Sequence, residues 1–202
     1  CILAVGMIGL MVPSAFAEYA KKSYDSEKFN FSINIPDDWD VETGRFDDGF
    51  EYLSLSGWQS DYSTYHREIT IEYDSPFKWM PVMFQENIIN KWRNHTDLER
   101  NNVHNFDVTY SKIVTLGETT RYDFEFQWNE QFNEYLPIDT VTQSVSIITN
   151  DNGMWYFYSH PVDKQNITWK IEHPQMFWDI VSSFRAYSPE QIEQIKIEKE
   201  QK

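Results

Sequence analysis

The residues that could do chemistry in this chain are carboxylates, histidines and serines, and their spacing matches neither a zinc site nor a serine-nucleophile motif. Five histidines are scattered over the 202 residues, and no two have the spacing of a zinc site. The segment Ser54-Leu55-Ser56-Gly57 lacks the first glycine of a Gly-x-Ser-x-Gly nucleophile motif. We therefore expect no enzymatic activity, no catalytic residue and no cofactor; a hydrolase-type activity is the enzymatic alternative.

Aspartates gather around two turns and could offer oxygen ligands to a hard cation. They are Asp37, Asp38 and Asp40 in one group and Asp47 and Asp48 in the other. Calcium binds several carboxylate oxygens at once, so these residues are candidates for a weak divalent-cation site. The EF-hand pattern is absent, and solvated turn carboxylates are the alternative interpretation.

Aromatic residues in a loop are the candidates for ligand binding. Trp58, Tyr62 and Tyr65 lie in a polar, loop-like segment, where a structural role is less expected than in a strand. They could stack on sugars or peptides. The aromatic run Trp155-Tyr156-Phe157-Tyr158 could do the same, but core packing accounts for at least its alternate members.

Three sequons make Asn30, Asn94 and Asn166 candidates for N-glycosylation. Asn30 falls in an alternating segment that predicts a strand. A glycan at Asn30 would require the polar face of that strand to be open to solvent, whereas a helix over that face would exclude the glycan.

Residues 1–17 predict export. They carry no charge, are apolar up to Val12 and end in Ala15-Phe16-Ala17, which is typical of a signal peptide with its cleavage site. We interpret them as a signal peptide truncated at its N-terminus and cleaved near Ala17. A retained short anchor and a lipidated Cys1 are the alternatives. The apolar run is shorter than the roughly 20 residues that span a bilayer, so we expect no membrane span in the mature chain and a secreted or cell-surface location.

The charge narrows the class of partner. The formal net charge is −15, which disfavours nucleic acid and anionic lipid because both require a basic face. The only cysteine is Cys1, so the mature chain would have neither a disulfide nor a thiol nucleophile. An envelope or extracellular protein is the expected partner, and the oligomeric state is left open.

The segment 29–35 organises the chain. Phe29, Phe31, Ile33 and Ile35 alternate with polar residues, which predicts a half-buried strand, and Pro36 should end it. Residues 18–28 are polar and predict a loose lead-in. Further strands are expected at 50–55, 66–73, 106–116, 122–128, 138–149 and 154–160. In the segment 106–116, the side chains expected on one face are Phe106, Val108, Tyr110, Val114 and Leu116.

Two core helices complete the pattern. Apolar residues recur at helical spacing over 76–94, where either Pro76 or Pro81 begins the helix. They recur again over His173–Phe184, where Pro174 is expected at or near the first helical position. Ser188-Pro189-Glu190-Gln191 predicts a capping box that begins a short exposed helix. Runs of consecutive strands flanked by helices predict the α+β class, with an antiparallel sheet of about six to seven strands and helices packed on it.

The two ends of this pattern resemble a known family. The segment from Phe29 to Trp39, with Tyr24 before it, is similar to the opening Phe-Ser-Ile-x-x-Pro-x-x-Trp of PsbP-like domains, which share the fold of the Mog proteins. The segment from Phe177 to Arg185, with Ser182-Ser183-Phe184, is similar to their C-terminal helix. The resemblance covers roughly residues 24–186. It implies an α/β/α sandwich around an antiparallel sheet, used for binding or assembly. The plant members support photosystem oxygen evolution, and no residue match extends that role to this chain.

The expected organisation is a signal peptide at 1–17, a polar lead-in at 18–28, one PsbP-like domain at 29–186 and a charged helix or tail at 187–202. Acidic, Asn-rich surface segments suggest an exported prokaryotic relative, with an archaeal source as one candidate. The expected function is that of a non-enzymatic binding or assembly-accessory module. The alternative is a surface-associated protein that binds carbohydrate or a divalent cation.

Overall fold

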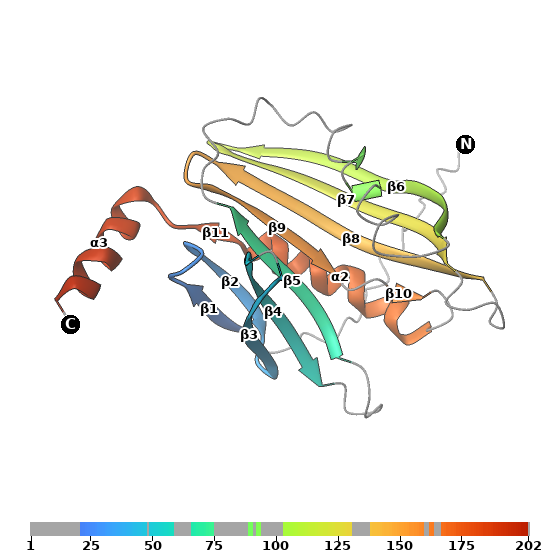
Figure 1. The fold of residues 1–202 in the computed structure, drawn as a ribbon, viewed down its shortest axis with the longest axis horizontal. Helices are drawn as coiled ribbons and strands as arrows, with labels where there is room; N and C mark the ends of the chain where they lie inside the picture. Colours follow the sequence, from blue (N-terminus) through green and yellow to red (C-terminus); the bar gives the residue numbers. More distant parts are fainter. Residues whose placement is uncertain are drawn as a thin grey trace, which may run out of the picture.

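The strands form two antiparallel sheets, as the computed structural model of the protein shows (Figure 1). The structure describes residues 21–47, 49–58, 66–74, 89–90, 92–93, 103–130, 138–159, 162–163 and 167–201. The small sheet has the order β1-β2-β11. These strands are β1 (Lys21–Ser26), β2 (Phe31–Pro36) and β11 (Arg185–Ala186).

The large sheet has the order β3-β4-β5-β9-β8-β7-β6. Its strands are β3 (Trp39–Arg45), β4 (Glu51–Trp58), β5 (His66–Asp74), β9 (Gly153–Ser159), β8 (Asp139–Asn150), β7 (Thr119–Glu130) and β6 (Val103–Leu116). A short strand, β10 (Val162–Asp163), also pairs with β8. The predicted α+β class with a largely antiparallel sheet is confirmed, with the opening strand placed in a second, smaller sheet.

The opening strand begins later than its alternation predicts. Phe31, Ile33 and Ile35 of β2 are at most 1% exposed, and the strand ends at Pro36 as expected. Asn30 is not part of it, because its backbone is left-handed, with φ 57°, in the turn that precedes β2. On the polar face of β2, Asn34 is exposed and Ser32 is half-buried.

The prediction of a loose lead-in at 18–28 was wrong, because residues 21–26 form β1. This strand pairs with β2 along its whole length, and Tyr24 packs against the core. The Nζ atom of Lys22 donates to the carbonyl oxygens of Asp37 and Trp39, at 2.8 and 2.6 Å. Pairing and tertiary contacts therefore give a strand where the side-chain pattern alone is weak.

Strand β9 contributes side chains to two hydrophobic cores, which lie on opposite faces of the large sheet. Trp155 and Phe157 lie in the first core, and Met154 and Tyr156 lie in the second. Side chains alternate across a strand, so one strand supplies both faces of the sheet. The prediction that core packing accounts for at least alternate members of this aromatic run is confirmed.

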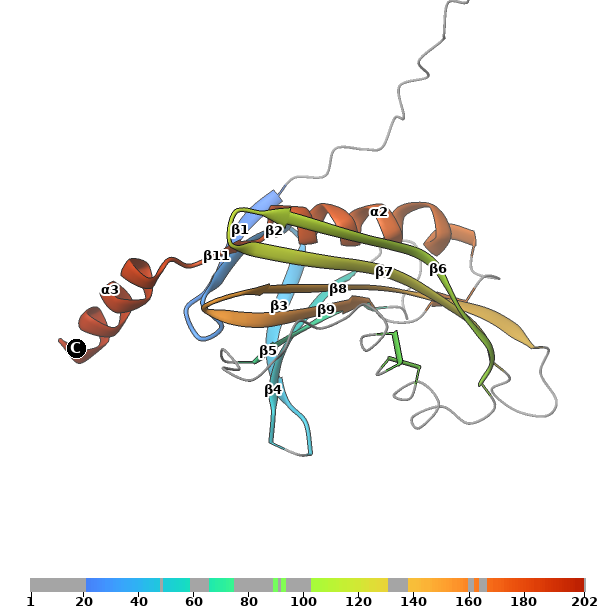
Figure 2. The same ribbon diagram turned by 90° about the horizontal axis from the view of Figure 1, so that it is seen from above.

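Helix α2 (Ile167–Ser183) covers the first core, and Figure 2 shows it along one face of the sheet. Among the described side chains of α2, the buried ones are Phe177, Ile180 and Val181, and Phe184 lies just beyond its end. The helix begins at Ile167, earlier than predicted. Pro174 lies inside it, where a missing N–H removes one backbone hydrogen bond without ending the helix.

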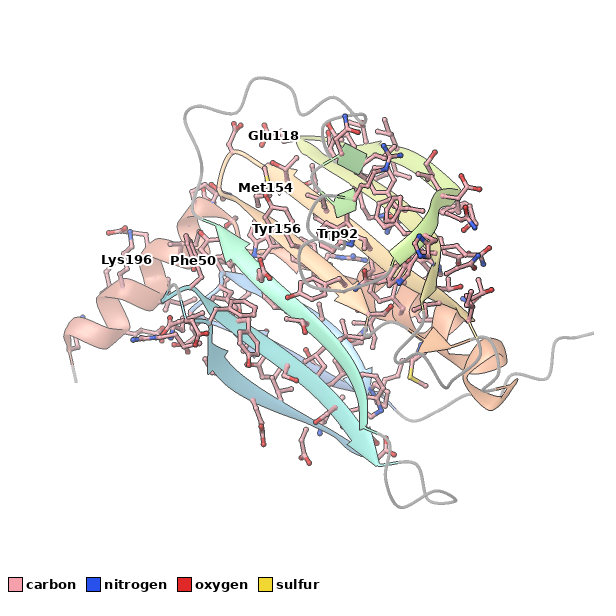
Figure 3. The ribbon with its side chains drawn as sticks, turned by 45° about the vertical axis from the view of Figure 1, so that its right-hand side comes forward. Phe50, Trp92, Glu118, Met154, Tyr156 and Lys196 are labelled. Atoms are coloured by element: carbon pink, nitrogen blue, oxygen red, sulfur yellow. The ribbon has the colours of Figure 1, made fainter. Side chains whose placement is uncertain are left out.

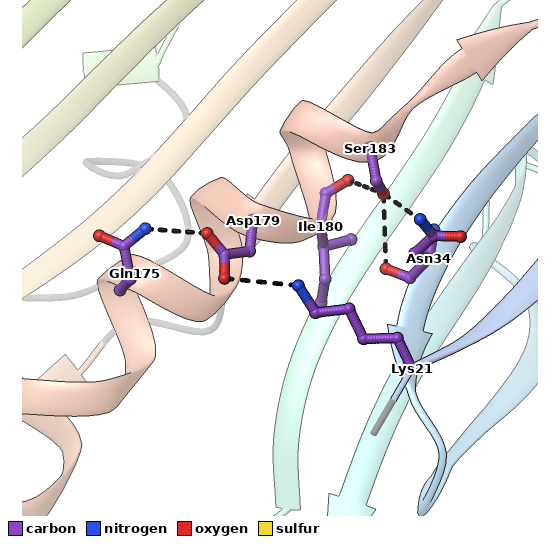
Figure 4. Close-up of polar contacts among 6 residues, drawn as sticks. All are labelled: Lys21, Asn34, Gln175, Asp179, Ile180 and Ser183. Atoms are coloured by element: carbon purple, nitrogen blue, oxygen red, sulfur yellow. Dashed lines mark hydrogen bonds and ion pairs between the residues drawn. The ribbon is translucent and has the colours of Figure 1, made fainter. Parts of the chain in front are cut away.

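Polar contacts fix the end of α2 against the small sheet (Figure 4). The Ser183 hydroxyl accepts from the Asn34 N–H at 2.8 Å and donates to the Ile180 carbonyl at 2.6 Å. Asp179 accepts from Gln175 at 2.8 Å and pairs with Lys21 at 3.9 Å. The first core is therefore closed by both packing and hydrogen bonds.

The second core is covered by the segment that contains Ile89 and Trp92. Residues 89–90 and 92–93 are helical, which agrees with the predicted helix over 76–94; its other residues lie outside the described part. The Nε1 of Trp92 donates to Gln143 Oε1 at 3.0 Å, and Gln143 donates to the Ser159 carbonyl at 2.9 Å. These bonds tie this segment to β8 and β9.

The C-terminal helix α3 (Pro189–Glu200) lies apart from the sheets (Figure 1). The Ser188 hydroxyl accepts from the Gln191 N–H, and the Gln191 side chain accepts from the Ser188 N–H, so the predicted capping box is confirmed. In the described part of the chain, no helix has the length and apolar character needed to cross a membrane.

Candidate functional site

The aspartates proposed as a cation site are divided between the two ends of β3. Asp37 and Asp38 form the turn before β3, and Asp40 is exposed near its start. Asp47 follows the other end, roughly 20 Å away at the usual rise per residue of a strand, and Asp48 lies outside the described residues. Asp37, Asp38 and Asp40 therefore do not form one site with Asp47. Among the described residues, no group of three or more His, Cys, Asp or Glu side chains could hold a metal ion.

The loop aromatics lie largely outside the described part. Trp58 is the last residue of β4 and is paired with His66 of β5, which places its backbone at the end of a hairpin. Its side chain, Tyr62 and Tyr65 lie outside the described residues. Their role in ligand binding stays a prediction.

Asn30 is the one glycosylation candidate within the described residues, since Asn94 and Asn166 lie outside them. Its Nδ2 lies 3.4 Å from the hydroxyl of Tyr73, and its carbonyl accepts from the Tyr187 N–H at 2.9 Å. A glycan would attach to the same Nδ2. Because Asn30 precedes the strand, occupancy would report on this turn, and the prediction that it reports on the polar face of β2 was wrong.

A buried carboxylate, Asp123 of β7, lies on the α2 side of the sheet. Its side chain is 2% exposed and pairs with Arg121 Nε at 3.0 Å. It also accepts from the Ser146 hydroxyl at 2.7 Å. Arg121 extends the cluster to α2, where its NH1 lies 3.5 Å from Ser182 Oγ. The cluster links β7, β8 and α2.

The chemistry of this cluster is limited by its burial. Ser146 is fully buried, and its hydroxyl is committed to Asp123. Burial is the largest effect on Asp123 and raises the pKa of its carboxyl, although the Ser146 hydrogen bond and the Arg121 charge act to lower it. Removing one partner of such a buried pair is destabilising, because the remaining charge is left buried without compensation.

The raised pKa makes a testable contribution to stability. A carboxyl whose pKa is higher in the folded state than its unfolded value near 3.8 binds its proton more tightly when folded. Its contribution is therefore fully present at low pH and is lost as pH rises through the folded pKa. We expect the stability of the wild type minus that of Asp123→Asn to fall as pH rises from about 4 through the raised pKa of the folded state. Urea unfolding of both proteins across this range measures it, and a difference that rises with pH contradicts the assignment.

Large apolar side chains that neither core uses lie exposed on two hairpins. In the β3–β4 hairpin, Phe46 is 37% and Phe50 is 62% exposed. In the β6–β7 hairpin, Tyr110 is 42%, Ile113 is 51% and Leu116 is 72% exposed. Figure 2 shows the β3–β4 hairpin projecting from the side of the sheet opposite α2.

The β3–β4 hairpin holds its aromatic rings in a defined geometry. The Phe46 N–H donates to the Phe50 carbonyl at 2.8 Å, and the Phe46 ring lies 4.4 Å from that of Tyr52. Glu51 pairs with Lys28 at 2.6 Å and with Arg45 at 2.8 Å, and these hydrogen bonds lower the pKa of its carboxyl. Figure 3 labels Phe50, just before the start of β4, and the second-core residues Trp92 and Tyr156.

The exposed residues of β6 were missed because a β-bulge changes which face they occupy. Phe106 and Val108 pack against the second core as expected. The register with β7 then shifts between Val108 and Tyr110, so Tyr110 lies on the α2 side, with its ring 5.9 Å from that of Trp178. A shift of one residue exchanges the faces of all later side chains. The signal in the sequence is that the apolar residues Phe106 and Val108 stand at even positions, whereas the next apolar residue on that face, Ile113, stands at an odd position.

Comparison with known proteins shows the fold. No family model and no curated protein matches the chain by sequence. Among solved structures, it is similar to the solution structure of cyanobacterial PsbP (CyanoP) from Synechocystis sp. PCC 6803, with a TM-score of 0.60 and 12% identity. The match covers 92% of this chain and 99% of that one. The chain therefore has a PsbP-like α+β fold.

Proposed function

We propose that this protein is an exported, non-enzymatic binding or assembly-accessory module that docks to an envelope or extracellular protein. The observation that carries the proposal is the exposed pair Phe46 and Phe50. These rings lie on a hairpin stabilised by backbone hydrogen bonds and ion pairs, and Phe50 is 62% exposed. Aromatic side chains are enriched in the centres of protein interfaces.

Two further features support a binding role over catalysis. The buried Asp123 and Ser146 are bonded to each other and lie away from solvent. The PsbP-like fold spans nearly the whole chain, so the exposed hairpin belongs to one continuous folded unit. Export is the matching proposal for residues 1–17, and sequencing the N-terminus of the native protein for a start at Glu18 tests it.

Co-purification from native envelope tests the docking surface. Wild type is expected to retain a stoichiometric protein partner, and the double variant Phe46→Ser/Phe50→Ser is expected to lose it. Ile197→Ser is the matched control, because Ile197 is 48% exposed on α3 and should leave binding unchanged. Equal partner recovery by all three proteins would contradict the proposal.

Binding of carbohydrate or a divalent cation is the second candidate, and it rests on Trp58, Tyr62, Tyr65 and the two aspartate groups. A glycan array and a calcium titration separate it from the first. A melting temperature that rises from chelator to millimolar calcium would favour the cation, and an unchanged one would remove it.

A further inference from the structure

The outer edge of β6 has no strand partner among the described residues, because β6 ends the order of the large sheet. An open edge presents a row of backbone N–H and C=O groups that can pair with another strand. Native proteins protect such edges with bulges, twist and local side-chain bonds.

The first half of β6 is protected. Its register with β7 shifts between His104 and Asp107 and again between Val108 and Tyr110. The Val108 N–H donates to Asp107 Oδ1 at 2.8 Å. The second half, residues 111–116, pairs with β7 residue by residue without a shift. The regular half is therefore the part of the edge on which a strand could be added.

The β6–β7 turn fixes which backbone groups point outward. Its two-residue loop is Gly117-Glu118, and Gly117 has φ +62°, as expected for glycine at the first position of a type II′ turn. In such hairpins the pair beside the loop, here Leu116 and Thr119, is hydrogen-bonded. Alternation then directs the N–H and C=O groups of Ser111, Ile113 and Thr115 to the outer edge.

The exposed side chains of this half are symmetric about Ile113. Tyr110 precedes it by three residues and Leu116 follows it by three, and these are the three large apolar side chains of β6 that are exposed. An antiparallel pair of identical strands has a two-fold axis, so a pattern that is symmetric about Ile113 places each exposed apolar side chain opposite another one.

We propose that the β6 edge from Tyr110 to Leu116 binds a second copy of this chain, antiparallel, with Ile113 opposite Ile113. Tyr110 of each copy then lies opposite Leu116 of the other copy. The outward N–H and C=O groups of Ser111 then bond to those of Thr115 in the second copy. The groups of Ile113 bond to those of Ile113 in the second copy. In this register the outward backbone groups gain hydrogen-bond partners, and the exposed apolar side chains are covered at the same time.

The charges permit this register. Lys112 faces Val114 of the second copy, and the two Lys112 side chains are diagonal neighbours at roughly 7–8 Å. Each lies directly opposite its own Asp123 on β7, which offsets its charge. The remaining repulsion comes from the net charge of −15 per chain, so added salt should strengthen the dimer by screening.

Sedimentation velocity of the mature chain over a range of concentrations tests the proposal. Wild type is expected to show a concentration-dependent dimer that strengthens with salt. Ile113→Lys places two ammonium groups opposite each other and should weaken the dimer at least about tenfold. Ile138→Lys is the matched control, because Ile138 is 57% exposed and lies outside the proposed register; it should dimerise as wild type does.

Two results would overturn the proposal: a wild type that stays monomeric up to roughly millimolar concentration, or equal weakening by both lysine variants. A second measurement fixes the register. In the chain from Glu18 onward, which contains no other cysteine, Ile113→Cys is expected to form a disulfide-linked dimer under mild oxidation far faster than Ile138→Cys. Equal rates for the two cysteines would overturn the register.

Discussion

Trp155→Ala is expected to lower the free energy of unfolding by about 3–5 kcal/mol, as is typical of large aromatic truncations in cores. Trp155 is fully buried in β9. Its ring lies 5.0 Å from that of Phe184 and 5.5 Å from that of Tyr73. Its Nε1 donates to the Phe29 carbonyl at 2.7 Å, so truncation also leaves a buried acceptor without its donor. Urea unfolding at neutral pH measures the change.

Two controls separate packing from the hydrogen bond. Trp155→Phe keeps an aromatic ring but loses the donor, so its cost should lie well below that of alanine. Tyr110→Ala removes a ring that is 42% exposed and should cost under about 1 kcal/mol. A loss below about 1 kcal/mol for Trp155→Ala would contradict the placement of this residue at the centre of the first core.

Gly57→Ala is the second large effect, and its expected cost is about 2–3 kcal/mol from overpacking. Gly57 of β4 is directly opposite Trp39 of β3, and an added Cβ would overlap the indole Cδ1 and Nε1 atoms. Trp39 is 2% exposed and lies in the first core. The indole therefore cannot move aside without disturbing its neighbours.

Gly44→Ala is the matched comparison within the same hairpin. Gly44 is opposite Tyr52, and an added Cβ would overlap that ring in the same way. Tyr52 is half-buried, so its ring can swing toward solvent, and the cost should stay under about 1 kcal/mol. Thermal unfolding of both variants measures the difference. Equal losses would mean that the burial of the facing ring does not decide the cost.

The sequence predicts the parts of the fold that side-chain period controls. The alternation at Phe31, Ile33 and Ile35 and the helical spacing at Phe177, Ile180 and Val181 both report directly on burial, and all six residues are at most 1% exposed. The capping box at Ser188 is local and was predicted for the same reason.

The parts that failed depend on partners or on backbone geometry. Strand β1 exists through its pairing with β2, which its own polar sequence does not reveal. Asn30 adopts a left-handed backbone, which asparagine tolerates better than most residues, and so the strand begins after it. The bulges of β6 reverse its faces beyond Val108, and the strict alternation that predicts a strand cannot show this.

The candidate surfaces were harder to predict than the cores. An exposed Phe50 and a buried Phe31 look alike in a sequence, and the distinction requires knowing which hairpin projects from the sheet. The aspartate groups at Asp37 and Asp47 are close in sequence, but β3 separates them in space.

A photo-crosslinking amino acid at position 50, introduced into the full chain in its native envelope, tests the docking surface directly. Position 196 is the control, because the Lys196 side chain is 64% exposed on α3. The proposed function predicts one discrete protein adduct from position 50 and none from position 196. No adduct from position 50, or the same adducts from both positions, would contradict it.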